Sequence, residues 1–182
     1  MNRTVAAFSL VLLVGFVPLS AGATDLAGPL SGTLSAGTYR IVDDINVPTG
    51  QTLVLEPGVV FEFEDSLFEE FEFDVDGTLL AEGTAWDPVI FRAASGVPEF
   101  NYMRIASGSS VMRHCIVEDA GKVSAQAKGG LWIDGASPLI EDCEVRDGSW
   151  HGIYVTGSGA MPTIRRTVCR DNAGDGIDGD SD

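Results

Sequence analysis

Aromatic and charged residues recur at matching places in four short segments, MRIASG, LWIDGA, IYVTGS and the partial IDGDSD. If the apolar residues of each segment point inward, the residues between them point outward. The outward residues then form two columns: Arg104, Trp132, Tyr154 and Asp178, and beside them Ala106, Asp134, Thr156 and Asp180. Two large aromatic rings and an arginine would thus stack beside carboxylates.

Flat rings next to hydrogen-bonding acids suit a pyranose, which has apolar faces and a rim of hydroxyl groups. The predicted carbohydrate-binding residues are Arg104, Trp132, Asp134, Tyr154 and His151. Two plainer explanations stay open. Aromatic residues favour strands without any ligand, and His151, which follows Trp150, can be a turn residue.

The last residues suggest a metal ion. Asp178, Asp180 and Asp182 match the first ligands of a D-x-D-x-D calcium loop, but the glycine and distal glutamate of that loop are missing. In the competing interpretation, Gly176 and Ile177 begin another strand and the aspartates form its turn. We expect no required cofactor and treat calcium as an optional ligand.

Catalytic residues cannot be assigned. Glycoside hydrolysis needs two carboxylates about 5 to 9 Å apart, and Asp134 with Asp178 or Asp180 could supply them. A lyase needs a basic residue beside a uronate, and four residues qualify by type alone: Arg146, Arg165, Arg166 and Arg170. Pairing of Arg146 and Arg170 with neighbouring acids explains those two more simply.

These residues belong to a repeat. The segments VMRHCIVED, LIEDCEVRD and TIRRTVCRD lie 28 and 24 residues apart and alternate apolar and polar positions in twos. Short β-type runs with a period of 22 to 28 residues, broken by glycine and aspartate, predict a β-solenoid with like residues stacked on successive coils. Residues 121–130 interrupt the repeat and are predicted to form a loop.

The cysteines fit the same repeat. Cys115 and Cys143 share one column, and Cys169 shares the next with Val117 and Val145. An odd number of cysteines cannot pair completely within one chain, and the spacing matches no zinc motif. We expect free, buried thiols, although Cys115 and Cys143 are close enough for a disulfide in principle.

The first half follows the plan less regularly. Eight of the fifteen residues from Glu62 to Asp76 are carboxylates, within the run FEFEDSLFEEFEFDVDG. The two-residue period places the phenylalanines inward and Glu62, Glu64, Glu72 and Asp74 outward. The stretch is therefore predicted to be core on one side and solvated acid on the other, with occasional calcium binding between stacked carboxylates.

Three runs carry a family resemblance: GQTLVLEPGVVFEF, DGTLLAEGT and PLIEDCEVRDG followed by HGIYVTGS. They resemble secreted bacterial right-handed parallel β-helix proteins of the pectate-lyase-like superfamily, from about Gly32 onward. The resemblance implies an all-β, right-handed parallel β-helix of about six coils, with sugar bound along the outer face of one sheet. It does not imply a reaction, because the superfamily includes lyases, hydrolases, epimerases and adhesins.

The N-terminus predicts export. Residues 1–23 are typical of a signal peptide: Arg3 is followed by an apolar run from Val5 to about Val17 and by the small residues Ala21-Gly22-Ala23. The apolar run is too short for a membrane-spanning helix. Cleavage leaves one β-helix domain, residues 24–182, with a net charge of −17. That charge excludes nucleic acid as a partner. We expect a secreted or extracytoplasmic location and no membrane insertion.

The sequence therefore predicts a secreted module that presents a sheet face to a polysaccharide or cell-surface glycan. Two alternatives stay open: a polysaccharide lyase or glycoside hydrolase acting on acidic polysaccharide, and a purely structural adhesin-like stalk. Because a solenoid needs a polar cap and none is evident, we expect further coils or domains after Asp182, or a partner on the last coil.

Overall fold

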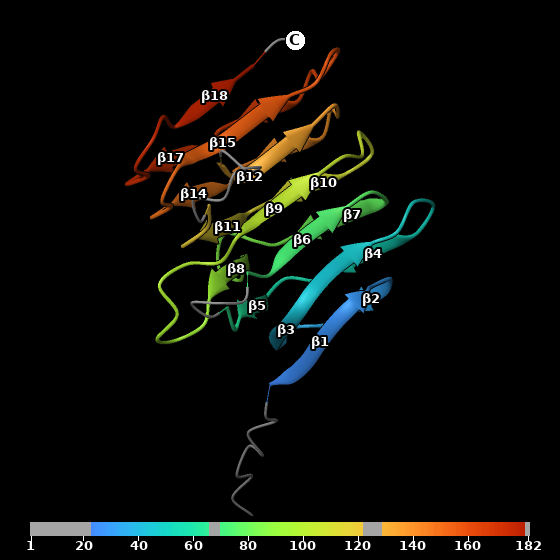
Figure 1. Ribbon diagram of the computed structural model, residues 1–182. Helices are drawn as coiled ribbons and strands as arrows, with labels where there is room; N and C mark the ends of the chain where they lie inside the picture. Colours follow the sequence, from blue (N-terminus) through green and yellow to red (C-terminus); the bar gives the residue numbers. More distant parts are fainter. Residues whose placement is uncertain (1–22, 66–69, 122–128, 181–182) are drawn as a thin grey trace, which may run out of the picture.

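The structure is a computed structural model that describes residues 23–65, 70–121 and 129–180. These residues form strands β1 to β18 and no α-helix. Every strand pairs in parallel with the strand one winding before or after it. Figure 1 shows the chain winding upward from β1 to β18. The predicted all-β parallel solenoid is confirmed.

The solenoid has three faces, which we call arms. Arm 1 contains β5 (Val59–Phe63), β8 (Val89–Ala93), β11 (Cys115–Glu118), β14 (Glu144–Arg146) and β17 (Val168–Arg170). Arm 2 contains β6 (Glu72–Val75), β9 (Tyr102–Ile105), β12 (Gly129–Asp134), β15 (His151–Thr156) and β18 (Ile177–Gly179). Arm 3 is a separate six-stranded sheet of β2 (Gly32–Leu34), β4 (Thr52–Leu55), β7 (Thr78–Glu82), β10 (Val111–Arg113), β13 (Leu139–Glu141) and β16 (Thr163–Arg165).

Two long strands begin the solenoid. Strand β1 (Thr24–Pro29) pairs with β3 (Gly37–Val47), and β3 pairs with β5 through its first half and with β6 through its second half. Arms 1 and 2 are therefore joined into one sheet at this end. From the first to the last of the six strands of arm 3 the chain completes about five turns, close to the predicted six coils.

The core follows from the two-residue period of the strands. Phe61, Phe63, Phe73 and Phe91 point inward and are fully buried. The ring of Phe61 lies edge-on to that of Phe91, with 5.6 Å between the ring centres. Phe63 stacks on Phe100 at 4.1 Å. Aromatic pairs in these geometries add to the free energy gained by burying their apolar area.

The carboxylate-rich stretch behaves as predicted on its described residues; residues 66–69 lie outside them. Three of its outward acids pair with arginines on neighbouring windings. Arg92 binds Glu62, Arg40 binds Glu64 and Arg104 binds Asp74. The sequence did not show that each of these acids is neutralised by an arginine 24 or 30 residues away along the chain.

Opposite charges alternate from β1 and β3 along arm 1 as far as Arg146, where the alternation ends because Arg170 on β17 lies directly opposite Arg146. Asp25 is opposite Arg40, Arg40 opposite Glu62, and Glu62 opposite Arg92. Further along, Glu118 is opposite Arg146 and forms an ion pair with it. We call Asp25, Arg40, Glu62, Arg92, Glu118 and Arg146 the arm 1 charge ladder.

Arm 3 carries a similar arrangement. Four charged residues of alternating sign lie opposite one another on successive strands: Glu82 on β7, Arg113 on β10, Glu141 on β13 and Arg165 on β16. Each neighbouring pair forms an ion pair. Most members of both ladders lie on outward positions and keep contact with solvent, but Glu141 is buried between its arginine partners.

The aspartates that close each repeat have a conformational role. Asp119, Asp147 and Asp171 have φ of 57°, 58° and 56°, in the left-handed region. Asp and Asn tolerate this region better than most side chains because their short polar groups hydrogen-bond locally. The aspartate column therefore marks the corner where the chain leaves arm 1 for arm 2.

The cysteine columns are as predicted. Val145 is opposite both Val117 and Cys169, and two cysteines are buried on adjacent windings, Cys115 at the start of β11 and Cys143 just before β14. All three thiols are free. Most of the predicted loop, residues 122–128, lies outside the described residues, as does the predicted signal peptide up to residue 22. In the described part of the chain, no helix is long and apolar enough to cross a membrane.

Candidate functional site

The predicted outward columns exist on arm 2. Arg104 is opposite Trp132, Trp132 is opposite Tyr154, and Tyr154 is opposite Asp178. Asp134 in the second column is opposite Thr156. Strands β9, β12, β15 and β18 lie side by side in this order (Figure 1). The structure therefore brings the predicted carbohydrate-binding residues onto one face.

Arg104 is the centre of this face. Its guanidinium binds Asp134 at 2.9 Å, Asp76 at 3.1 Å and Asp74 at 3.4 Å. Burial alone would lower the pKa of Arg104, but these hydrogen bonds and charges raise it above its ordinary value. Arg104 is therefore a permanent cation whose donors are directed at protein carboxylates.

Trp132 is half-buried and held on three sides. Its indole N–H donates to Thr156 Oγ1 at 2.7 Å. The guanidinium carbon of Arg104 lies 5.6 Å from the ring centre, within the range of a cation–π contact. Tyr102 meets the ring edge-on at 5.7 Å. These contacts fix the orientation of the indole before any ligand arrives.

Tyr154 lies in the outward column but contributes little surface, because only 4% of it is exposed. The ring of His151 stacks over it at 6.2 Å, and its hydroxyl donates to Asp180 Oδ2 at 2.5 Å. Trp132 is therefore the one aromatic platform that the predicted strip provides within the described residues, and Tyr154 supports the residues around it.

His151 is the first residue of strand β15 and not a turn residue, and it lies beside the predicted site. Its Nδ1 accepts a hydrogen bond from the backbone N–H of Asp175 at 2.8 Å. Its Nε2 lies 3.4 Å from Asp178 Oδ2. Because Nδ1 is an acceptor, the proton of the neutral ring lies on Nε2 and points toward Asp178.

The predicted metal ligands are not assembled in the described residues. Asp178 lies against His151, Asp180 accepts the Tyr154 hydroxyl, and Asp182 lies outside the described residues. Within residues 23–65, 70–121 and 129–180, no three His, Cys, Asp or Glu side chains are grouped as metal ligands. Ile177, Asp178 and Gly179 form strand β18, so the further strand of the competing interpretation is present, but Asp178 belongs to that strand and not to a turn.

Sequence reasoning missed the acids that surround Arg104. Asp74 is directly opposite Arg104 on β6, and Glu72 is opposite Tyr102. Burial raises the pKa of Glu72 and of Asp74. Burial, with the neighbouring Glu72, also raises the pKa of Tyr102, so its hydroxyl keeps its proton and donates to Glu72. Aligning the first half of the chain with the later repeats would have found these partners.

The four arginines considered for a lyase are all engaged in ion pairs. Arg146 binds Glu118, and Arg170 binds Glu144 and Asp171. Arg165 and Arg166 both bind Glu141. Charge pairing along the solenoid therefore accounts for each of them, as the sequence suggested for Arg146 and Arg170.

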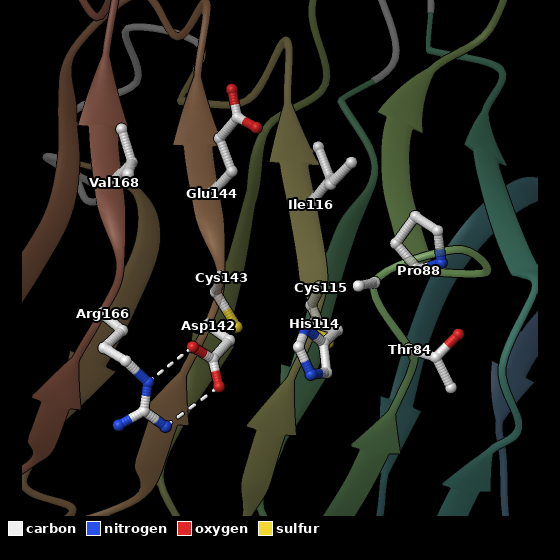
Figure 2. A pocket seen from close by; sticks show the side chains of 11 residues that line it. Thr84, Pro88, His114, Cys115, Ile116, Asp142, Cys143, Glu144, Arg166 and Val168 are labelled. Carbon is white, nitrogen blue, oxygen red and sulfur yellow. Dashed lines mark hydrogen bonds and ion pairs between the residues drawn. The ribbon is translucent and has the colours of Figure 1, made fainter.

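A pocket lies on arm 1. This pocket of about 350 Å³ is bounded by Thr84, Ala85 and Pro88, by Ile116, Glu144 and Val168, and by His114, Cys115, Asp142, Cys143 and Arg166. Figure 2 shows Cys115 and Cys143 on adjacent strands, with Arg166 bonded to Asp142 beside them. His114, Asp142 and Arg166 have φ between 46° and 54°, so they turn the chain from arm 3 into arm 1.

Comparisons with protein-family models, curated proteins and solved structures give no match for this chain. The class of protein is therefore defined by its own fold, a parallel β-solenoid with an acid-rimmed aromatic face on arm 2.

Proposed function

We propose that the chain is an exported module of the pectate-lyase-like β-helix kind that binds carbohydrate on the outer face of arm 2. The observation that supports this most directly is the fixed, half-buried ring of Trp132, placed between Arg104 and Thr156. A rigid aromatic ring beside polar groups loses little conformational entropy on binding and matches the apolar face of a pyranose.

The negative charge on the outer face of arm 2 favours neutral sugars or amino sugars as ligands. One cation, Arg104, stands among six acidic residues: Glu72, Asp74, Asp76, Asp134, Asp178 and Asp180. A uronate carboxyl would have to approach this excess of negative charge, and the Nε and Nη1 donors of Arg104 already bind protein carboxylates. Repulsion of this kind discriminates against the wrong ligand.

The test compares two tryptophans by affinity electrophoresis through gels that contain a neutral glucan, chitosan or a polygalacturonate. We expect retardation of the wild-type chain in a neutral or amino-sugar gel. Trp132→Ala should weaken binding by about tenfold or more, which corresponds to about 1.4 kcal/mol. Trp86→Ala is the matched control, because Trp86 is 92% exposed on a turn between β7 and β8.

Each possible result of the gel experiment has a distinct interpretation. Retardation only in polygalacturonate would contradict the charge argument. Equal loss of binding in Trp86→Ala would contradict the placement on arm 2. Absence of retardation in every gel would reject carbohydrate binding and favour the structural stalk, whereas release of unsaturated oligosaccharides would establish a lyase.

A further inference from the structure

Two thiols meet in the wall of the pocket on arm 1. Cys115 begins β11 and Cys143 immediately precedes β14. Ile116 is opposite Glu144 in the parallel register, so the preceding residues, Cys115 and Cys143, are neighbours on successive windings. Neighbouring parallel strands lie about 4.8 Å apart, within the range of Cα separations that a disulfide spans.

The side chains point to the same place. Cys115 Sγ lies 3.3 Å from the carbonyl oxygens of both Ala81 and Arg113, which are alternative acceptors for its one proton. Cys143 Sγ donates to the carbonyl oxygens of Glu141 at 3.2 Å and Met112 at 3.6 Å. The Cys115 thiol can also donate its proton to Cys143 Sγ, which accepts it. A thiol pair in mutual contact needs only a small change in side-chain torsion to bond.

The pair is asymmetric in both access and acidity. Cys143 is 5% exposed and Cys115 only 1%. The hydrogen bond from Cys115 lowers the pKa of Cys143, whereas burial raises the pKa of Cys115 well above its ordinary value. The thiolate is the nucleophile in disulfide exchange, so Cys143 is the thiol suited to react first.

We propose that Cys143 and Cys115 form a redox-active dithiol that opens on this pocket and closes reversibly into a disulfide between successive windings. The co-reactant is a small disulfide such as oxidised glutathione. The pocket, about 350 Å³, admits part of such a molecule, and Arg166 and His114 line it beside the thiols (Figure 2).

The exchange takes two balanced steps. Cys143 Sγ, as a thiolate, attacks one sulfur of the small disulfide; the S–S bond breaks and one thiolate leaves and takes up a proton. Cys115 then loses its proton to solvent, and its sulfur attacks Cys143 Sγ and expels the second thiolate. Two protein thiols become one disulfide, and one small disulfide becomes two thiols.

Cys169 provides the matched control. It is also partly buried, but it lies in the neighbouring column, opposite Val145, and no cysteine is opposite it. It should therefore form no disulfide within the chain.

In the test, the purified, folded chain is incubated with oxidised glutathione and the reaction is quenched with acid. The protein is then unfolded, its remaining thiols are alkylated, and its intact mass is measured by mass spectrometry. We expect one alkylated cysteine in place of three, with the loss of two hydrogen atoms and no retained glutathione. Cys169→Ser should still lose both remaining thiols. Cys115→Ser should retain one glutathione on Cys143, and peptide mapping locates it.

Three alkylated cysteines in the wild-type chain after excess oxidised glutathione would overturn the proposal. So would a disulfide that involves Cys169. Because the wild-type measurement and the peptide map need no variant, the proposal stays testable even where a cysteine substitution prevents folding. Return of all three thiols on addition of reduced glutathione is the expected sign of reversibility.

Discussion

Glu141 shows how one side chain can hold three windings together. Its carboxylate accepts from Arg113, which belongs to the winding below, and from Arg165 and Arg166, which belong to the winding above. The hydrogen bonds from Arg165 and Arg113 lower the pKa of Glu141 to about 2. Only 8% of this side chain is exposed, so it is nearly sealed between the arginines.

We therefore predict that Glu141→Gln lowers the melting temperature at neutral pH, because three cations lose the anion between them. A carboxyl with a depressed pKa stabilises the fold above its unfolded pKa and loses that effect as pH falls through its folded pKa. The difference between wild type and variant should shrink as pH falls from about 4.5 to about 2. Thermal unfolding followed by circular dichroism across that window measures it.

The control is Glu56→Gln, an exposed residue at the turn between β4 and β5. It should change the melting temperature little at any pH in the window, as is usual for surface substitutions. A Glu141→Gln difference that is constant with pH would contradict the ion-pair explanation.

At the scale of the element, each strand is too short to be stable by itself and depends on the strands above and below. Contacts between the aromatic rings of the core connect each strand to its neighbours. Phe61 on β5 contacts Tyr39 on β3, Phe73 on β6 and Phe91 on β8. One side chain thus connects arms 1 and 2 as well as neighbouring windings.

We predict that Phe61→Ala lowers the free energy of unfolding by about 3–5 kcal/mol, the usual cost of emptying a core phenylalanine site. Phe61 is fully buried. Urea unfolding followed by tryptophan fluorescence measures the change.

Trp86→Ala, at the 92% exposed position, should stay within about 0.5 kcal/mol of wild type. A small loss for Phe61→Ala together with a reduced denaturant slope would instead indicate that this part of the solenoid unfolds independently of the rest.

The regularity of the strands determines which features could be predicted from the sequence. Alternation in twos and the recurrence of VMRHCIVED-like segments sufficed for the fold and for the column of Arg104, Trp132 and Tyr154. The burial of Tyr154 could not be read from its outward position, because His151 and Asp180 cover it. Likewise, the partners of Arg104 come from the irregular first half, where no repeat could be aligned.

At the scale of the whole molecule, negative charge dominates. The chain has 27 acidic and 11 basic residues, a net charge of −16. The arginines on the outer faces are taken up in short ion pairs, so the remaining acids repel one another over longer distances. Salt screens such long-range repulsion more than it screens close, partly buried pairs.

We predict that the melting temperature rises as sodium chloride increases from about 10 mM to about 300 mM, a range that shortens the screening length several-fold. Calcium chloride and magnesium chloride should raise it equally when compared at the same ionic strength, because the outward acids Glu62, Glu64 and Asp74 are already bound by arginines. Differential scanning calorimetry in matched buffers measures both effects.

A rise specific to calcium, abolished by EDTA, would revive calcium binding at the acidic stretch or at the aspartates near the C-terminus. A fall in melting temperature with sodium chloride would mean that the ion pairs contribute more to stability than the net repulsion costs.

The charge ladders have a consequence for how the chain finds its register. A solenoid of similar windings can misfold by looping one winding out and stacking the next in its place. On arm 1 that slip would set Arg40 against Arg92, and on arm 3 it would set Glu82 against Glu141. Like charges directly opposite each other are destabilising. The alternation therefore disfavours a stacking that skips one winding along arm 3 and along arm 1 as far as Arg146, but not beyond it, because Arg170 lies directly opposite Arg146 in the native register.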